Sequence, residues 1–135
     1  MYELSLLGTL QLWDAAKTTL RLDEMRACLH DQAVMETVAS EWRAVGADEA
    51  VDRIRAALLR DPLYLEGVWF YDEVAPEVVL TAMPVRERSA GGRVRQHGVY
   101  RLTSGSGGLI WRQRLFTSRE QAVGCLREEG PSLGL

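Results

Sequence analysis

The stretch from Gly98 to Val123, GVYRLTSGSGGLIWRQRLFTSREQAV, constrains the fold more than any other part of the sequence. Two runs of alternating residues flank the segment SGSGG, a pattern typical of a β-hairpin with its turn. Ser118 with Gln121 three residues later forms a capping-box pattern, and so does Thr117 with Glu120. The sequence therefore predicts a hairpin that leads directly into a short helix.

The period of the apolar residues changes once along the chain. Before Pro62 the spacing is helical in three segments, over residues 6–16, 22–29 and 47–59, and a brief segment at 33–38 is compatible with a strand. After Pro62 the period is two, which predicts strands over residues 65–71, 77–88, 93–103 and 109–116. Helices followed by an antiparallel sheet indicate an α+β fold, with the helices packed on one face of a curved sheet.

The length and composition predict one globular domain. A chain of 135 residues with 47% apolar and 26% charged residues is ordinary for such a protein. We expect a helical part over residues 1–60, a sheet over 64–117 and a terminal helix over 118–128. No apolar run reaches membrane length and the first residues lack a basic leader, so we predict a cytoplasmic protein with no membrane contact. Cys28 and Cys125 are then expected to be reduced and buried.

In element order, residues 4 to 127 resemble the nuclear transport factor two-like superfamily. This superfamily includes SnoaL-like polyketide cyclases, ketosteroid isomerases and limonene epoxide hydrolases. The segments that carry the resemblance are LDEMRACLHDQAVMET (22–37), VGADEAVDRI (45–54) and the hairpin with its helix (98–123). The resemblance implies a cone-shaped fold whose sheet wraps a pocket closed by the helices, and it implies a homodimer.

The same resemblance predicts that the catalytic acids of these families are missing. Thr37 matches the base of the isomerases, Trp13 matches their oxyanion-hole tyrosine, and Gly98 matches their second acid. Gln113 matches an acid of both the epoxide hydrolases and the SnoaL-type cyclases. The remaining epoxide-hydrolase positions match Met35, Thr37, Met83 and Val85. General acid–base assistance is worth roughly two to four orders of magnitude in rate, so the sequence leaves open whether any reaction is catalysed.

If Gln113 faces inward, the alternation of the strands predicts which side chains line a pocket. Such a pocket is mostly apolar with few polar anchors, which suits a small hydrophobic molecule without a cofactor. The other interpretation is that the same residues only fill the core. The predicted lining residues are Trp13, Met35, Thr37, Met83, Val85, Gln96, Tyr100, Trp111, Gln113 and Leu115.

Glu36 is the acid that would best restore an enzymatic interpretation. It alternates with Thr37 and should point away from the pocket, unless a one-residue bulge turns it inward as a base. Trp69 and Tyr71 share one face of the first long strand, but the sequence does not decide which face. His30 and His97 have no partner at a metal-ligand spacing, so no metal site is predicted.

Charge is distributed unevenly along the chain. Residues 1–77 hold 7 basic and 15 acidic residues, whereas residues 78–117 hold 7 arginines and one acid. Alternation predicts an arginine-rich outer face of the sheet. This face is either solvated and paired with scattered carboxylates, or meets the acidic helices of a second copy, or binds an anionic partner. Its use as a contact surface would make the protein a non-catalytic, dimeric interaction module, which is the alternative to a small-molecule binding function. Aromatic residues are too sparse on that face for a nucleic-acid platform. Besides Arg93, its predicted members are Arg86, Arg88, Arg95, Arg101, Arg112 and Arg114.

Overall fold

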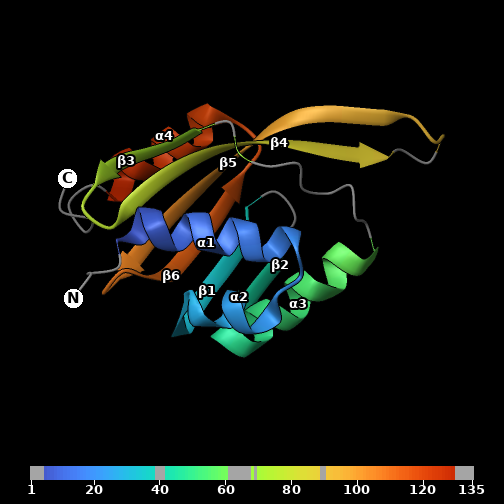
Figure 1. The fold of residues 1–135 in the computed structure, drawn as a ribbon. Helices are drawn as coiled ribbons and strands as arrows, with labels where there is room; N and C mark the ends of the chain where they lie inside the picture. The colour runs from blue at the N-terminus through green and yellow to red at the C-terminus, as the bar shows by residue number, and fades with distance from the viewer. Residues whose placement is uncertain (1–4, 39–41, 61–67, 69, 89–90, 130–135) are drawn as a thin grey trace.

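The computed structural model describes residues 5–38, 42–60, 68, 70–88 and 91–129, and Figure 1 shows their arrangement. The predicted α+β class and the short C-terminal helix are confirmed. In chain order the elements are α1 (Leu6–Thr18), α2 (Leu22–Ala27), β1 (Leu29–Thr37), β2 (Trp42–Val45), α3 (Ala47–Arg60), β3 (Phe70–Ala75), β4 (Val78–Arg88), β5 (Val94–Ser106), β6 (Leu109–Phe116) and α4 (Arg119–Glu129).

The six strands form one mixed sheet in the order β2-β1-β6-β5-β4-β3. Four neighbouring pairs are antiparallel, but β1 and β6 run parallel, with Met35 opposite Gln113. The expectation of a purely antiparallel sheet is therefore wrong at this pair. Strands β1 and β6 lie far apart in the sequence, so no tight turn fixes their relative direction.

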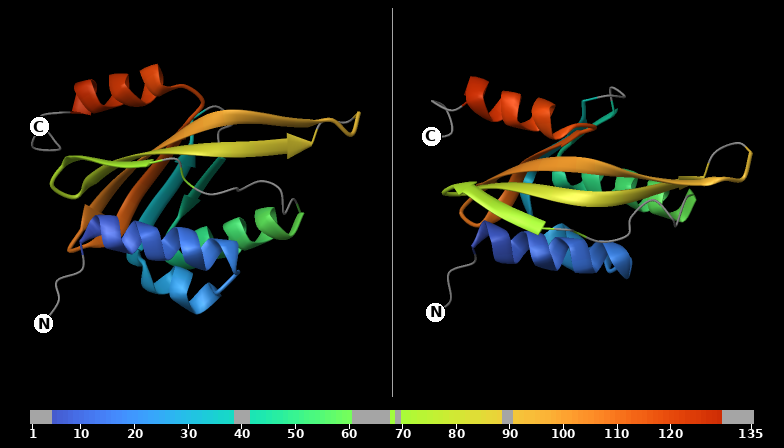
Figure 2. Two further views of the ribbon diagram at one scale, coloured as in Figure 1. Left: turned by 45° about the horizontal axis from the view of Figure 1, so that its top comes forward. Right: turned by 90° about the horizontal axis from the view of Figure 1, so that it is seen from above.

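Helices cover both faces of the sheet, but unequally. Helices α1, α2 and α3 lie on one side, which we call the inner face, and α4 lies on the other, the outer face (Figure 2). On the inner face Leu10 of α1 belongs to a buried cluster with Met35 and Ile110. On the outer face Leu102 of β5 packs in a second cluster with Leu126 of α4. Each face thus has its own apolar core.

The hairpin and the cap that the sequence predicts are both present. Gly107 and Gly108 have positive φ angles of 61° and 81°, which a two-residue hairpin turn requires, so the turn is shorter than the five-residue SGSGG segment. The hydroxyl of Ser118 accepts a hydrogen bond from the backbone N–H of Gln121 at 3.2 Å and begins α4.

The part of the chain expected to be helical also contributes two strands. β1 begins earlier than the predicted segment at 33–38, and the four-residue strand β2 has no counterpart among the predictions. A strand of four residues is too short for its alternation to be recognised. Residues 65–67 and 69 of the predicted first strand lie outside the described residues, and β3 begins at Phe70.

Candidate functional site

A group of charged side chains lies between α1 and the inner face of the sheet. Asp14 of α1 receives two hydrogen bonds from the guanidinium of Arg101 on β5, at 2.7 and 2.9 Å. The hydroxyl of Tyr71 on β3 donates to the same carboxylate at 2.6 Å. Arg101 is only 1% exposed, and its Nη2 also lies 3.4 Å from the hydroxyl of Thr81 on β4. This arrangement ties the first helix to three strands.

Lys17 completes this group from the next turn of α1. Its Nζ lies 3.5 Å from Oδ1 of Asp14 and 5.5 Å from the centre of the Trp13 ring. Lys17 is buried, and it is the only lysine in the sequence. Trp13, Asp14, Lys17, Tyr71 and Arg101 are called the interior cluster below.

Burial and mutual contact shift three pKa values within the interior cluster. Desolvation opposes ionisation of Asp14, but the hydrogen bonds and charge of Arg101, aided by Lys17, outweigh it and hold its pKa well below 3.8. Desolvation lowers the pKa of Lys17 to about 8, although the charge of Asp14 opposes this. Burial and the hydrogen bond to Asp14 raise the pKa of Tyr71 above its ordinary range. At neutral pH Asp14 is thus ionised, Tyr71 is neutral, and Lys17 is mainly protonated.

The strand register shows which residues share the inner face with Arg101. Directly paired residues of neighbouring strands point to the same side of a sheet, and Arg101 is paired with Thr81 and Leu115. In the adjacent row Thr103 is paired with Gln113. Gln113 and Thr103 are both buried, so amide, hydroxyl and guanidinium groups lie next to one another beneath α1.

Several polar atoms on this face are buried without a hydrogen-bond partner among the described residues. They are Nε1 of Trp13, Nε of Arg101, Oγ1 of Thr103 and Nε2 of Gln113. Three of the four are N–H donors, and leaving such a group unsatisfied costs about 1–3 kcal/mol each. Each of these three N–H groups would be satisfied by an acceptor oxygen.

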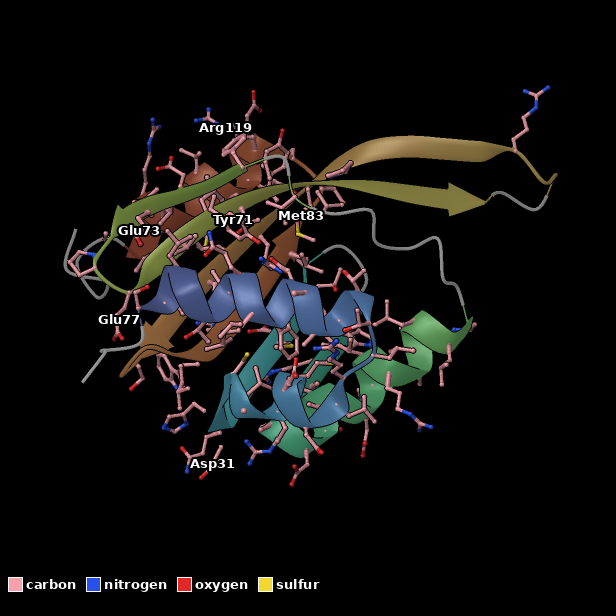
Figure 3. The ribbon with its side chains drawn as sticks, viewed as in Figure 1. Asp31, Tyr71, Glu73, Glu77, Met83 and Arg119 are labelled. Carbon is pink, nitrogen blue, oxygen red and sulfur yellow. The ribbon has the colours of Figure 1, made fainter. Side chains whose placement is uncertain are left out.

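Most of the predicted lining residues with described side chains lie on the inner face. Trp13 and Met35 are buried in the core cluster of that face, and Gln113 lies opposite Met35. Thr37 and Leu115 are paired with each other and are half-buried. Met83 is 3% exposed, and Figure 3 shows its side chain and that of Tyr71 between the sheet and α1.

Two predicted lining residues lie elsewhere. Tyr100 packs against the outer-face cluster beneath α4. Neighbouring residues of a strand point to opposite faces of the sheet, and the adjacent Arg101 points to the inner face. Trp111 is 47% exposed, since the register of β5 and β6 shifts between Ser104 and Gly105 and Trp111 falls within this irregularity. The side chains of Val85 and Gln96 lie outside the described part of the structure.

The predicted arginine face is wrong in part. Arg101 points inward to Asp14, because β5 presents its odd-numbered residues to α1. Arg114 is buried, with its Nη1 2.8 Å from Sγ of Cys125 on α4. Arg112 is half-buried and forms an ion pair with Glu36 at 3.1 Å. The side chains of Arg86, Arg88 and Arg95 lie outside the description, whereas Arg93 is exposed.

Glu36 has no access to the interior cluster from this position. Its register is continuous from Val34 to Thr37, so no bulge turns it inward. The carboxylate that does lie inside is Asp14, which matches none of the family positions considered in the sequence. The helical period offered a signal for it, because Leu10, Asp14 and Lys17 follow one another at four- and three-residue intervals on one face of α1.

The arrangement favours binding and hydrogen-bond donation over proton abstraction by a carboxylate. Asp14 is a weak base because its pKa is depressed and both its oxygens accept hydrogen bonds. Within the interior cluster, Lys17 is the group whose pKa, about 8, lies nearest to neutrality. Among the described residues no cluster of three or more histidine, cysteine or carboxylate side chains is suited to a metal ion.

Comparison with known proteins identifies the class of fold. The chain superimposes with a TM-score of 0.68 on an LEH-like epoxide hydrolase from M. tuberculosis (19% identity, covering 90% of each chain). It matches a protein assigned as a SnoaL-like polyketide cyclase from Jannaschia sp. CCS1 with a TM-score of 0.67 (13% identity, 92% of this chain and 93% of the other). An uncharacterized cystatin fold protein from Novosphingobium aromaticivorans gives 0.70 (19% identity, 83% and 97%).

The predicted nuclear transport factor two-like fold is confirmed, because an NTF2-like protein from Burkholderia pseudomallei K96243 also superimposes with a TM-score of 0.67 (14% identity, 92% of this chain and 97% of the other). At these identities the likeness concerns the fold and not the activity. No protein-family model and no curated protein sequence matches the chain. No helix in the described part of the chain is long and apolar enough to cross a membrane.

Proposed function

We propose that this protein binds a small, largely hydrophobic metabolite between α1 and the inner face of the sheet. The observation that carries the proposal is the set of buried donors on Trp13, Arg101 and Gln113 that have no partner among the described residues and that lie on the same face as the apolar core cluster. A ligand with an apolar body and an acceptor oxygen would satisfy these donors and bury its remaining surface against Met35 and Met83. The lining we propose consists of the described inner-face residues of the predicted set, with Arg101 and Tyr71 added: Trp13, Met35, Thr37, Met83, Gln113, Leu115, Arg101 and Tyr71.

Any reaction would be a cofactor-free isomerisation, cyclisation or hydration. Two of the structural neighbours are named as an epoxide hydrolase and a polyketide cyclase, which supports chemistry of this kind without specifying it. Here such chemistry would depend on ligand positioning, on N–H donors that stabilise negative charge on oxygen, and on the ammonium of Lys17 as a proton donor. Cytoplasmic location belongs to the same proposal.

Replacement of Gln113 by leucine tests this proposal. The variant keeps the volume of the side chain but removes its donor, while Gln11→Leu alters an exposed glutamine of α1 and serves as a control. Titration with neutral steroid, monoterpene and naphthol probes, followed by calorimetry, should show saturable binding that Gln113→Leu weakens at least tenfold and Gln11→Leu leaves unchanged. Equal affinities of the two variants would place the ligand elsewhere, and no binding by any probe would favour a filled core.

We also propose a homodimer formed through the outer face of the sheet. Trp111 is 47% exposed and Val45 is 55% exposed. Val45 lies in the same cross-strand row as Val34 and Arg112, on the part of the sheet that α4 leaves open (Figure 2). Exposed apolar side chains on an open sheet favour a second copy as partner.

The alternative function is that of a non-catalytic interaction module that uses the arginine-rich outer face. Arg101 and Arg114 do not belong to its contact surface, because both side chains are buried.

A further inference from the structure

The interior cluster contains more positive than negative charge. The described contacts join one carboxylate, Asp14, to two cations, Lys17 and Arg101. Tyr71 is neutral at physiological pH, since the ordinary pKa of a tyrosine hydroxyl is about 10 and that of Tyr71 is raised further. The cluster therefore has a net charge of about +1 inside the fold, where an uncompensated charge is costly.

Asp14 has no capacity left for further donors. Its Oδ1 is contacted by Arg101 Nη1 and Lys17 Nζ, and its Oδ2 by Arg101 Nη2 and the Tyr71 hydroxyl. A carboxylate offers about four lone-pair sites, so these four contacts fill it. The buried N–H groups of Trp13, Arg101 and Gln113 that have no acceptor in the described structure must find one outside this carboxylate.

These donors lie around one region of the inner face. Lys17 and Arg101 contact the same oxygen of Asp14, and the ring of Trp13 lies beneath the Lys17 ammonium. Gln113 is paired with Thr103, two residues along β5 from Arg101, so Arg101 and Gln113 are diagonal neighbours on one face. A second anion placed here would meet two positive charges and several N–H donors.

We propose that the ligand carries a carboxylate, which binds beside Lys17 and Arg101 and accepts hydrogen bonds from Trp13 and Gln113. This inference rests on the proposed function, because it names the charged part of the metabolite that binds there. A single carboxylate neutralises the surplus charge of the cluster, whereas a phosphate dianion would exceed it. The ligand class is therefore a hydrophobic carboxylic acid in its ionised form.

The test compares two probes that share an apolar body. At pH 7, binding of 2-naphthoate and of its neutral methyl ester is measured by calorimetry to the wild-type protein, Lys17→Met and Arg21→Met. Arg21 is exposed and lies shortly after the end of α1, so its replacement removes one positive charge from the surface without touching the cluster. We expect the carboxylate to bind at least tenfold more tightly than the ester in the wild type and in Arg21→Met, and this preference to vanish in Lys17→Met.

The outcomes separate the two proposals. Equal binding of carboxylate and ester to the wild type would overturn the carboxylate inference but leave the apolar site intact. A preference that survives in Lys17→Met would also overturn it, because the surplus charge would not be the cause. Failure of both probes to bind at millimolar concentration would overturn the proposed function as well.

A spectroscopic measurement tests independently whether the carboxylate binds beside Lys17. Because the chain has one lysine, protein labelled with ¹³C-lysine gives a single side-chain signal whose titration reports this group alone. Saturating 2-naphthoate should raise the pKa of Lys17 from about 8, whereas the methyl ester should leave it unchanged. An unchanged titration with bound 2-naphthoate would contradict placement of the carboxylate beside Lys17.

Discussion

Replacement of Asp14 by asparagine should strongly destabilise the protein. The change keeps the size of the side chain but removes the only negative charge among the described residues that contacts Arg101 and Lys17. Arg101 is 1% exposed and its guanidinium makes two hydrogen bonds to Asp14, so no solvent is available to replace the lost partner. Two cations would remain side by side in the interior.

The size of the effect follows from this burial. Removal of one partner from a buried ion pair costs about 3–5 kcal/mol, because the other charge stays buried and uncompensated. The asparagine amide still offers an oxygen to the Tyr71 hydroxyl, so that hydrogen bond need not be lost. The free energy of unfolding of a domain of this size is about 5–15 kcal/mol, so the variant should lose about a fifth or more of its stability.

Urea denaturation followed by tryptophan fluorescence measures this loss. With a slope of about 1–3 kcal/mol per molar urea, the unfolding midpoint should fall by on the order of 2 M. Asp52→Asn is the matched control, because Asp52 is an exposed carboxylate of α3. Its midpoint should stay close to that of the wild type, since surface substitutions change stability by about 0.5 kcal/mol or less.

The pH dependence of the same measurement identifies the charge as the cause. The folded-state pKa of Asp14 lies below its unfolded value of 3.8, so its contribution is complete above that value and is lost as the pH falls below it. The wild type and Asp14→Asn should therefore differ most at neutral pH and converge in acid. A difference under 1 kcal/mol at pH 7, or one that does not shrink in acid, would refute the buried ion pair.

Three further outcomes are expected. Gln113→Leu should raise the free energy of unfolding by roughly 1 kcal/mol in urea denaturation without ligand, because it removes a buried donor that has no partner among the described residues. The stability of the wild type relative to Lys17→Met should rise between pH 8 and 10.5, by up to about 3 kcal/mol in urea denaturation, since the unfolded state binds more protons in that range. Trp111→Glu should convert the proposed dimer to a monomer in analytical ultracentrifugation, and an unchanged mass would remove Trp111 from the interface.

The sequence alone predicts the strands and helices in which the period of the apolar residues is regular over a long segment. The β5–β6 hairpin and the cap of α4 could be predicted because Gly107, Gly108 and Ser118 perform roles that depend on local backbone geometry alone. The direction of β1 relative to β6 could not, because that pairing joins segments more than 70 residues apart and no local signal encodes it. Turn and cap residues can thus be predicted from the sequence, but the pairing of distant strands cannot.

The side-chain directions along β5 show why the candidate site was only partly predictable. Both faces of this strand are buried, with Leu102 beneath α4 and Arg101 beneath α1. Alternation therefore predicts the apolar residues of β5 on the inner face and its arginine on the outer face, the reverse of what the register imposes. The register of β5 and β6 shifts by one residue near Gly105, so Gln113 is paired with the odd-numbered Thr103. Simple alternation from the turn instead places the even-numbered residues of β5 on the same face as Gln113.

The interior cluster is difficult to explain by stability alone. Buried ion pairs can often be replaced by apolar groups of similar volume with little loss or even a gain of 1–4 kcal/mol. A variant with Asp14→Leu, Lys17→Met and Arg101→Met should therefore stay folded and unfold at a urea midpoint close to that of the wild type. The same variant should lose its preference for 2-naphthoate over the methyl ester. If this variant instead failed to fold while Lys17→Met alone folded normally, Asp14 and Arg101 would be required for the architecture of α1 on the sheet, and only Lys17 would remain assigned to the ligand.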